Sequence, residues 1–85
     1  MKAEMILWRD AHSVDCWTDL KDLAMEARAV ISVGVVVRES SDTVAISAGY
    51  DIEDGNACTT LIVPKAMIVK RQVLVDDVAA FSSPG

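Results

Sequence analysis

Residue types that build metal centres, disulfide frameworks and catalytic sites are scarce in this chain. Its 85 residues include one histidine, two cysteines, two prolines and four glycines. Cys16 and Cys58 are too few for a disulfide scaffold, and their flanks lack the paired spacing of a zinc site. One histidine also leaves a metal site short of ligands. We therefore expect no cofactor and no metal, with both thiols reduced and at least half-buried.

Long hydrophobic runs and glycine-rich phosphate motifs are missing as well. The apolar run Met5–Trp8 meets Arg9 and Asp10 before it reaches the length of a signal-peptide core. No other segment approaches the roughly 20 apolar residues that cross a bilayer. Ser32–Gly34 lacks the spacing of a P-loop or a dinucleotide fingerprint. These absences predict a soluble protein of a reducing cytoplasm.

The chain offers one combination of residues for nucleophilic catalysis, and it is a weak one. His12 and Cys16 form the only Cys/His pair, with Asp10 or Asp15 able to orient the imidazole. All four lie in one short connection, with no glycine-lined oxyanion site beside it. We therefore expect that the protein is not an enzyme.

An acidic segment, Asp51–Asn56, superficially resembles a calcium-binding loop. Its register is wrong, because Gly55 stands at the fifth position rather than the sixth and no glutamate follows at the twelfth. The segment is more typical of an acidic hairpin loop, with Asp54–Asn56 as its turn.

Acidic residues outnumber basic ones by thirteen to eight, which gives a net charge of −5. Such a chain repels duplex nucleic acid. A local basic patch is an exception, because Lys65, Lys70 and Arg71 are close in sequence, and Arg9 and Arg38 can join them in space. The patch is either a phosphate or carboxylate clamp or a set of solvated strand charges.

Runs rich in Val, Ile and Thr, separated by polar turns, occupy the stretch from Ala29 to Val75 and predict a small antiparallel sheet. Met5–Trp8 suits a strand that precedes them. The later strands are expected at residues 30–38, 43–48, 58–63 and 67–75, with one tight turn at Pro64–Ala66. Gly34, in mid-strand, marks a bend or bulge, or lets another backbone or a Trp ring come close.

From Thr18 the apolar residues recur at the spacing of a helix, which predicts one short helix after the first strand. Leu20, Leu23 and Ala27 fall on one helical face, and Thr18 can cap the helix. A helix of two to three turns is not stable alone in water, so it must pack against the sheet. The predicted fold is α+β and mostly β: an SH3-like or Sm-like curled sheet or barrel of about five strands. We expect residues 1–75 to form one β-rich domain and residues 76–85 a docked tail.

Aliphatic residues are in surplus for so small a domain. Hydrophobic residues make up 52% of the chain, but only 5% of it is aromatic. A domain of this size buries only roughly 60–65% of its unfolded surface. Trp8 and Trp17 are either core anchors or stacking platforms for a partner. The surplus predicts a homo-oligomer or a surface for another protein.

Five short motifs follow one another along the chain: Leu7–Asp10, Trp17–Thr18, Ser32–Gly34, Ile62–Lys65 and Ile68–Val69. Their order and spacing resemble a loose group of small uncharacterised proteins encoded by tailed phages and prophages. The resemblance covers roughly Met5 to Leu74 and includes a Trp-x-Asp start, a Ser-Val-Gly strand and an Ile-x-Pro-Lys turn. Val35 stands where the group often has an aromatic residue, which weakens the idea of a binding platform there. The resemblance implies a viral origin and no activity.

Three functions follow as hypotheses. The first is a noncatalytic interaction module that acts as a homo-oligomer on a host or phage protein in the host cytoplasm. The second is an oligomeric sponge that sequesters a small anionic nucleotide signal and so counters host defence. The third is a minor structural component of the virion. The candidate ligand- or partner-binding residues are Trp8, Arg9, Trp17, Tyr50, Lys65, Lys70 and Arg71.

Overall fold

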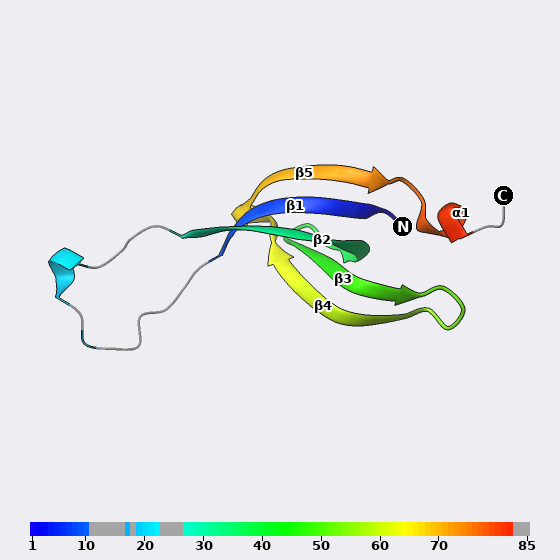
Figure 1. Cartoon of the computed structure of the whole chain (residues 1–85), viewed down its shortest axis with the longest axis horizontal. Helices are drawn as coiled ribbons and strands as arrows, with labels where there is room; N and C mark the ends of the chain where they lie inside the picture. The colour runs from blue at the N-terminus through cyan, green and yellow to red at the C-terminus, as the bar shows by residue number, and fades with distance from the viewer. Residues whose placement is uncertain (11–16, 18, 23–26, 83–85) are drawn as a thin grey trace.

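Five antiparallel β-strands make up most of the protein in the computed structural model, which describes residues 1–10, 17, 19–22 and 27–82 (Figure 1). Their order across the sheet is β4-β3-β2-β1-β5. This confirms the mostly-β, antiparallel prediction. The strands are β1 (Ala3–Asp10), β2 (Arg28–Glu39), β3 (Thr43–Asp51), β4 (Asn56–Pro64) and β5 (Ile68–Val75).

The prediction of a helix after the first strand is wrong for the residues that the structure describes. Between β1 and β2 they contain only a three-residue 3-10 turn, η1 (Leu20–Asp22). Leu20 is 83% exposed and Trp17 fully exposed, so neither packs against the sheet. A short helix without such packing lacks the stabilisation it needs. Thr18 and Leu23 lie outside the described residues.

The sheet stays open, so the prediction of a closed or strongly curled barrel is wrong. β2 pairs with β1 along Arg28–Val35 and with β3 along Val35–Glu39, with a register shift between Val36 and Arg38. A second 3-10 turn, η2 (Lys65–Met67), joins β4 to β5 at one end. From there the two edge strands diverge (Figure 1). Each pairs with a single neighbour in the described sheet.

Alternating side chains on the inner side of the sheet form the core. The Trp8 indole is 7% exposed, and its Nε1–H donates to Ser32 Oγ at 3.0 Å. Trp8 is therefore a core anchor, as one interpretation of the sequence expected. Because side chains alternate along a strand, the residues between these core positions lie on the opposite face. The core cluster comprises Ile6, Trp8, Val44, Ile46 and Val63, with Val30, Val36 and Ile68 packed against it.

Gly34 of β2 lies close to the backbone of β3. A Cβ at this position would overlap the Ser47 carbonyl oxygen and lie 3.0 Å from Ile46 Cγ1. Because glycine has no side chain, the backbone of β3 can approach β2 at this point. The predicted close approach of another backbone is therefore confirmed.

The acidic segment after β3 is a hairpin loop, as its sequence indicated. Asp51 Oδ1 accepts hydrogen bonds from the backbone N–H groups of Glu53 at 3.0 Å and Asp54 at 3.2 Å. Gly55 has φ +73°, a conformation that glycine adopts without strain. The side chain of Asp51 thus stabilises the turn through these hydrogen bonds.

The tail forms a short helix, α1 (Val78–Ser82), beside the start of the chain (Figure 1). The Val78 N–H donates to the Met1 carbonyl at 2.9 Å, and the Ala79 N–H donates to Asp77 Oδ1 at 3.0 Å. Residues 83–85 lie outside the described part. Within that part, no helix combines the length and the apolar character needed to span a membrane.

Candidate interaction surface

The outer side of β1 and β2 carries a patch of aliphatic side chains, which we call the outer patch. It comprises Met5, Leu7, Ile31, Val33 and Val35. Register fixes their arrangement, because Leu7 lies opposite Ile31 and Met5 lies opposite Val33. Residues directly opposite in an antiparallel pair share a face, so these side chains are neighbours. The patch is therefore one surface spanning two adjacent strands.

Two members of the outer patch are strongly exposed. Ile31 is 65% and Val33 59% exposed, and both stand on the part of β2 that pairs with β1 before the pairing with β3 begins at Val35. Beside them a shallow cavity of about 180 Å³ is lined by Met5, Leu7 and Ile31, together with Lys70 and Gln72 of β5. A contiguous group of exposed aliphatic side chains is typical of a contact surface.

A second apolar cavity continues the outer patch toward α1. It has a volume of about 410 Å³, and Ala3, Val35, Tyr50, Ile52, Val75 and Phe81 contribute to its lining. Phe81 is 80% exposed at its rim. The apolar surface thus runs along the strands from Leu7 to the C-terminal helix.

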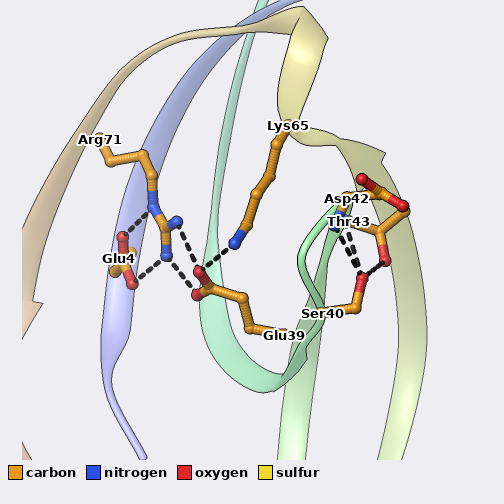
Figure 2. Close-up of polar contacts among 7 residues, drawn as sticks. All are labelled: Glu4, Glu39, Ser40, Asp42, Thr43, Lys65 and Arg71. Atoms are coloured by element: carbon orange, nitrogen blue, oxygen red, sulfur yellow. Dashed lines mark hydrogen bonds and ion pairs between the residues drawn. The ribbon is translucent and has the colours of Figure 1, made fainter.

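The basic residues around β5 form a charge network on the inner side of the sheet (Figure 2). Arg71 donates from Nε to Glu4 Oε1 at 2.8 Å and from Nη2 to Glu4 Oε2 at 2.9 Å. It also donates from Nη2 to Glu39 Oε1 at 2.9 Å, and Lys65 Nζ lies 2.7 Å from Glu39 Oε2. The network joins β1, β2, β5 and η2, and it lines part of an open groove of about 640 Å³.

Electrostatics in this network favour the charged forms of Glu39 and Arg71. Hydrogen bonds from Arg71 and then Lys65 lower the pKa of Glu39 to about 2. Hydrogen bonds to Glu4 and then Glu39 raise the pKa of Arg71 above its usual value. Two carboxylates thus neutralise the guanidinium, which leaves little positive field for an external anion.

The predicted binding residues do not gather in one place. Lys65 and Arg71 share Glu39, whereas Lys70 lies on the opposite face beside Leu7. Tyr50 lines the cavity near α1. The remaining three are Trp8, buried in the core; Trp17, fully exposed; and Arg9, whose Nη1–H donates to the Ala27 carbonyl at 3.5 Å.

Cysteine and metal chemistry find little support in the described residues. Cys58 is exposed on β4, which corrects the expectation of a buried or half-buried thiol. Its position explains the error, because β4 is an edge strand whose side chains are mostly uncovered. His12 and Cys16 lie outside the described part. Inside it, no group of three acidic, histidine or cysteine side chains is placed to hold a metal ion.

Sequence reasoning missed the outer patch and both partners of Arg71. The run Val30–Val37 is apolar at nearly every position, which predicts a strand covered on both faces. Nothing in the local sequence therefore indicates that Ile31 and Val33 are exposed. Glu4 and Glu39 are 67 and 32 residues from Arg71, so strand register alone brings them together.

Comparison with protein-family models, with curated proteins and with solved structures finds no match.

Proposed function

We propose that this chain is a noncatalytic protein-interaction module that acts as a homo-oligomer through the outer patch. The exposed pair of Ile31 and Val33, next to Leu7 and Met5 on one face of β1 and β2, carries the proposal. Complete burial of a fully exposed Val or Ile side chain contributes about 1.5–3 kcal/mol, and covering the exposed part of Ile31 and Val33 contributes a fraction of that value in each copy. Association is thus a direct way to remove this surface from water.

The further parts of the proposal concern origin and place. A phage-encoded protein of the host cytoplasm, with a host or phage protein as its partner, fits the resemblance of the sequence motifs. The strand order and the single turn between β4 and β5 support an SH3-like relationship for the open sheet. A role in the virion is the alternative setting for the same surface.

The nucleotide-sequestering alternative is less favoured by the geometry. It requires cations free to clamp phosphate, but Lys65 and Arg71 both pair with Glu39. Lys70 lies across the sheet from them. A thermal-shift screen with cyclic and ADP-ribose-type nucleotides tests it, because a ligand of the folded form raises the melting temperature.

The experiment for self-association compares two aliphatic positions of similar exposure. Ile31 is 65% and Ile62 57% exposed, but Ile62 lies on β4 outside the outer patch. Light scattering after size exclusion is expected to show an oligomer for the wild type and for Ile62→Thr. Ile31→Thr is expected to raise the dissociation constant by about tenfold, since a loss of about 1.4 kcal/mol corresponds to that factor.

Two results would contradict the proposal. One is a wild-type chain that stays monomeric at high micromolar concentration. The other is an equal loss of association in the Ile31 and Ile62 variants, which would place the contact elsewhere. Circular dichroism of each variant checks that the sheet is retained.

A further inference from the structure

The edge strand β4 carries no charge. It forms one border of the sheet and pairs only with β3 in the described sheet (Figure 1). Its nine residues, Asn56–Pro64, include no acidic and no basic side chain, and all but Val63 are exposed. The other edge strand, β5, has Lys70 and Arg71 in its middle. Charged residues on an edge strand prevent another strand from pairing with its open main-chain groups, so β4 lacks a protection that β5 has.

Two hydrogen bonds show which main-chain groups of β4 face away from β3. The Lys65 N–H donates to the Asp42 carbonyl at 2.7 Å. The next residue of the chain, Thr43, lies opposite Pro64, but its carbonyl accepts from the Ser40 N–H, at 2.9 Å. Because bonded and non-bonded pairs alternate along an antiparallel ladder, Thr43 and Pro64 form a non-bonded pair. The main-chain groups of Pro64 therefore face the free edge, which suits a residue without an N–H.

The same alternation turns the main-chain groups of Thr60 and Ile62 toward the free edge. Both lie at alternate positions before Pro64 in one continuous register, so they too belong to non-bonded pairs with β3. This open stretch is bounded at both ends. Pro64 has no N–H to donate, and Thr59 has φ +52°, which departs from the extended backbone of a strand. Between these bounds Thr60 and Ile62 each offer one open N–H and one open carbonyl.

We propose that a second copy of the chain pairs with this edge as an antiparallel strand, β4 against β4, about a two-fold axis at Leu61. In this register Thr60 of each copy lies opposite Ile62 of the other. Each such pair exchanges two hydrogen bonds, so the open groups of Thr60 and Ile62 are all satisfied in both copies. The same residues form the contact on both subunits, as a closed dimer requires, and the two sheets become one continuous sheet.

Neighbouring registers leave main-chain groups unmatched. An axis at Ile62 sets Thr60 opposite Pro64 of the other copy, which has no N–H for the Thr60 carbonyl. An axis at Thr60 requires Cys58, whose carbonyl already accepts a hydrogen bond from a serine hydroxyl of β3 at 2.6 Å. A shift by a single residue sets open groups opposite groups that face β3. The hydrogen-bonding pattern thus favours the register centred on Leu61.

The side chains around the axis suit this pairing. Leu61 is 40% and Ile62 57% exposed. The two Leu61 side chains lie directly opposite each other, and each Ile62 lies opposite a Thr60, so neighbouring side chains are aliphatic or β-branched. This contact lies outside the outer patch and is independent of it. The Ile62→Thr variant keeps every main-chain group, so it leaves the β4 pairing in place.

A disulfide at the axis tests the register. In a background of Cys16→Ser and Cys58→Ser, Leu61→Cys sets two thiols directly opposite each other across the axis. Residues of a non-bonded antiparallel pair have Cα atoms about 4.5 Å apart, within the range of about 4.4–6.8 Å that disulfides span. Mild oxidation is expected to convert most of the protein to a covalent dimer. Thr60→Cys and Ile62→Cys are matched controls, because each alone is expected to crosslink little and their mixture to give a covalent heterodimer.

Charged side chains at the axis provide a test at equilibrium. Leu61→Lys and Leu61→Glu each place like charges opposite each other, whereas their mixture places opposite charges there. In an Ile31→Thr background, which weakens the contact through the outer patch, native mass spectrometry of the mixture is expected to show heterodimer well above the statistical half. Leu74→Lys and Leu74→Glu are the controls, since Leu74 is 46% exposed on the other edge strand. Their mixture is expected to be statistical.

The results distinguish this pairing from association through the outer patch. If Leu61→Cys does not crosslink and the charged Leu61 variants mix statistically, the β4 pairing is overturned, and the edge is left to a strand of another protein. Crosslinking of Thr60→Cys alone, as complete as that of Leu61→Cys, overturns the register. Association that still depends on Ile31 leaves the proposed function intact in both cases. Should Leu61→Cys fail to fold, the mixture of Thr60→Cys with Ile62→Cys decides the register.

Discussion

Arg71 and Glu4 form a two-pronged ion pair that ties the edge strand β5 to β1, with distances of 2.8 and 2.9 Å. The Glu4 side chain is only 5% exposed, whereas Arg71 is 29% exposed. The carboxylate therefore depends on the guanidinium for both charge compensation and hydrogen bonding. A buried ion pair adds little to the free energy of unfolding compared with apolar side chains of the same size. Removing one partner, however, leaves an uncompensated buried charge, which is strongly destabilising.

Arg71→Met is expected to destabilise the fold by about 3–5 kcal/mol, because Glu4 is left buried without its partner. Changing both residues, in Glu4→Leu with Arg71→Met, is expected to recover much of that loss. Urea unfolding at one fixed protein concentration measures both effects, since association adds to apparent stability. A single variant that costs less than about 1 kcal/mol would show that Glu4 finds water or another partner.

Glu39 makes stability depend on pH in the acidic range. Its pKa falls from 4.5 to about 2 in the folded protein, chiefly through hydrogen bonds from Arg71 and Lys65. A lowered pKa means that the stabilisation is complete above the unfolded value, near 4.5, and is lost as the pH falls toward 2. Since the side chain is 38% exposed, solvent screening limits the effect to below about 1 kcal/mol.

Comparing the wild type with Glu39→Gln isolates this contribution. The difference in unfolding free energy is expected to be constant from pH 6 to about 5 and to shrink between pH 4.5 and 2. A difference that grows on acidification would have the wrong sign for a stabilised carboxylate. Added salt is expected to reduce the difference at neutral pH.

Local pattern predicted the strands well, because alternation and turn residues act over a few positions. Thr43–Ala48 alternates cleanly and lies within β3, and the predicted turn at Asp54–Asn56 overlaps the observed turn at residues 52–55, with Asn56 already in β4. The helix prediction failed because an amphipathic pattern at Leu20 indicates a helix only where a surface covers it. The open sheet does not cover Leu20, and nothing near that residue in sequence signals this.

The candidate site was harder to predict, since it depends on strand register. Lys70 and Arg71 are adjacent in sequence and look like one basic cluster. Alternation places them on opposite faces, Arg71 with the buried Glu4 and Lys70 beside the outer patch. Which face of β5 is inner depends on its pairing with β1, more than 60 residues away, as the separation of 67 between Arg71 and Glu4 shows.

The Ser32 hydroxyl accepts a hydrogen bond from the indole N–H, the only polar group of the Trp8 side chain. Removing this hydroxyl is expected to lower the free energy of unfolding. Ser32→Ala should cost about 1–2 kcal/mol, because the indole N–H loses its acceptor in a partly buried site. Ser32→Thr keeps a hydroxyl and serves as the control. With Trp17→Phe in the background, Trp8 alone reports by fluorescence, and the shift of its emission checks that the ring stays buried. Equal stability of the two Ser32 variants would show that the hydrogen bond contributes nothing.

Gly34→Ala is expected to be among the most damaging single-methyl changes in this chain. The added Cβ would overlap the Ser47 carbonyl oxygen, and that backbone is held in the ladder between β2 and β4. Strain of this kind costs roughly 2 kcal/mol or more. Gly49→Ala is the matched control, because its Cβ would lie 2.9 Å from Cys58 Sγ, the end of an exposed side chain that can rotate away. Thermal unfolding is expected to rank the variants in that order. The reverse ranking would mean that β3 moves away from β2 more readily than a single cysteine side chain turns.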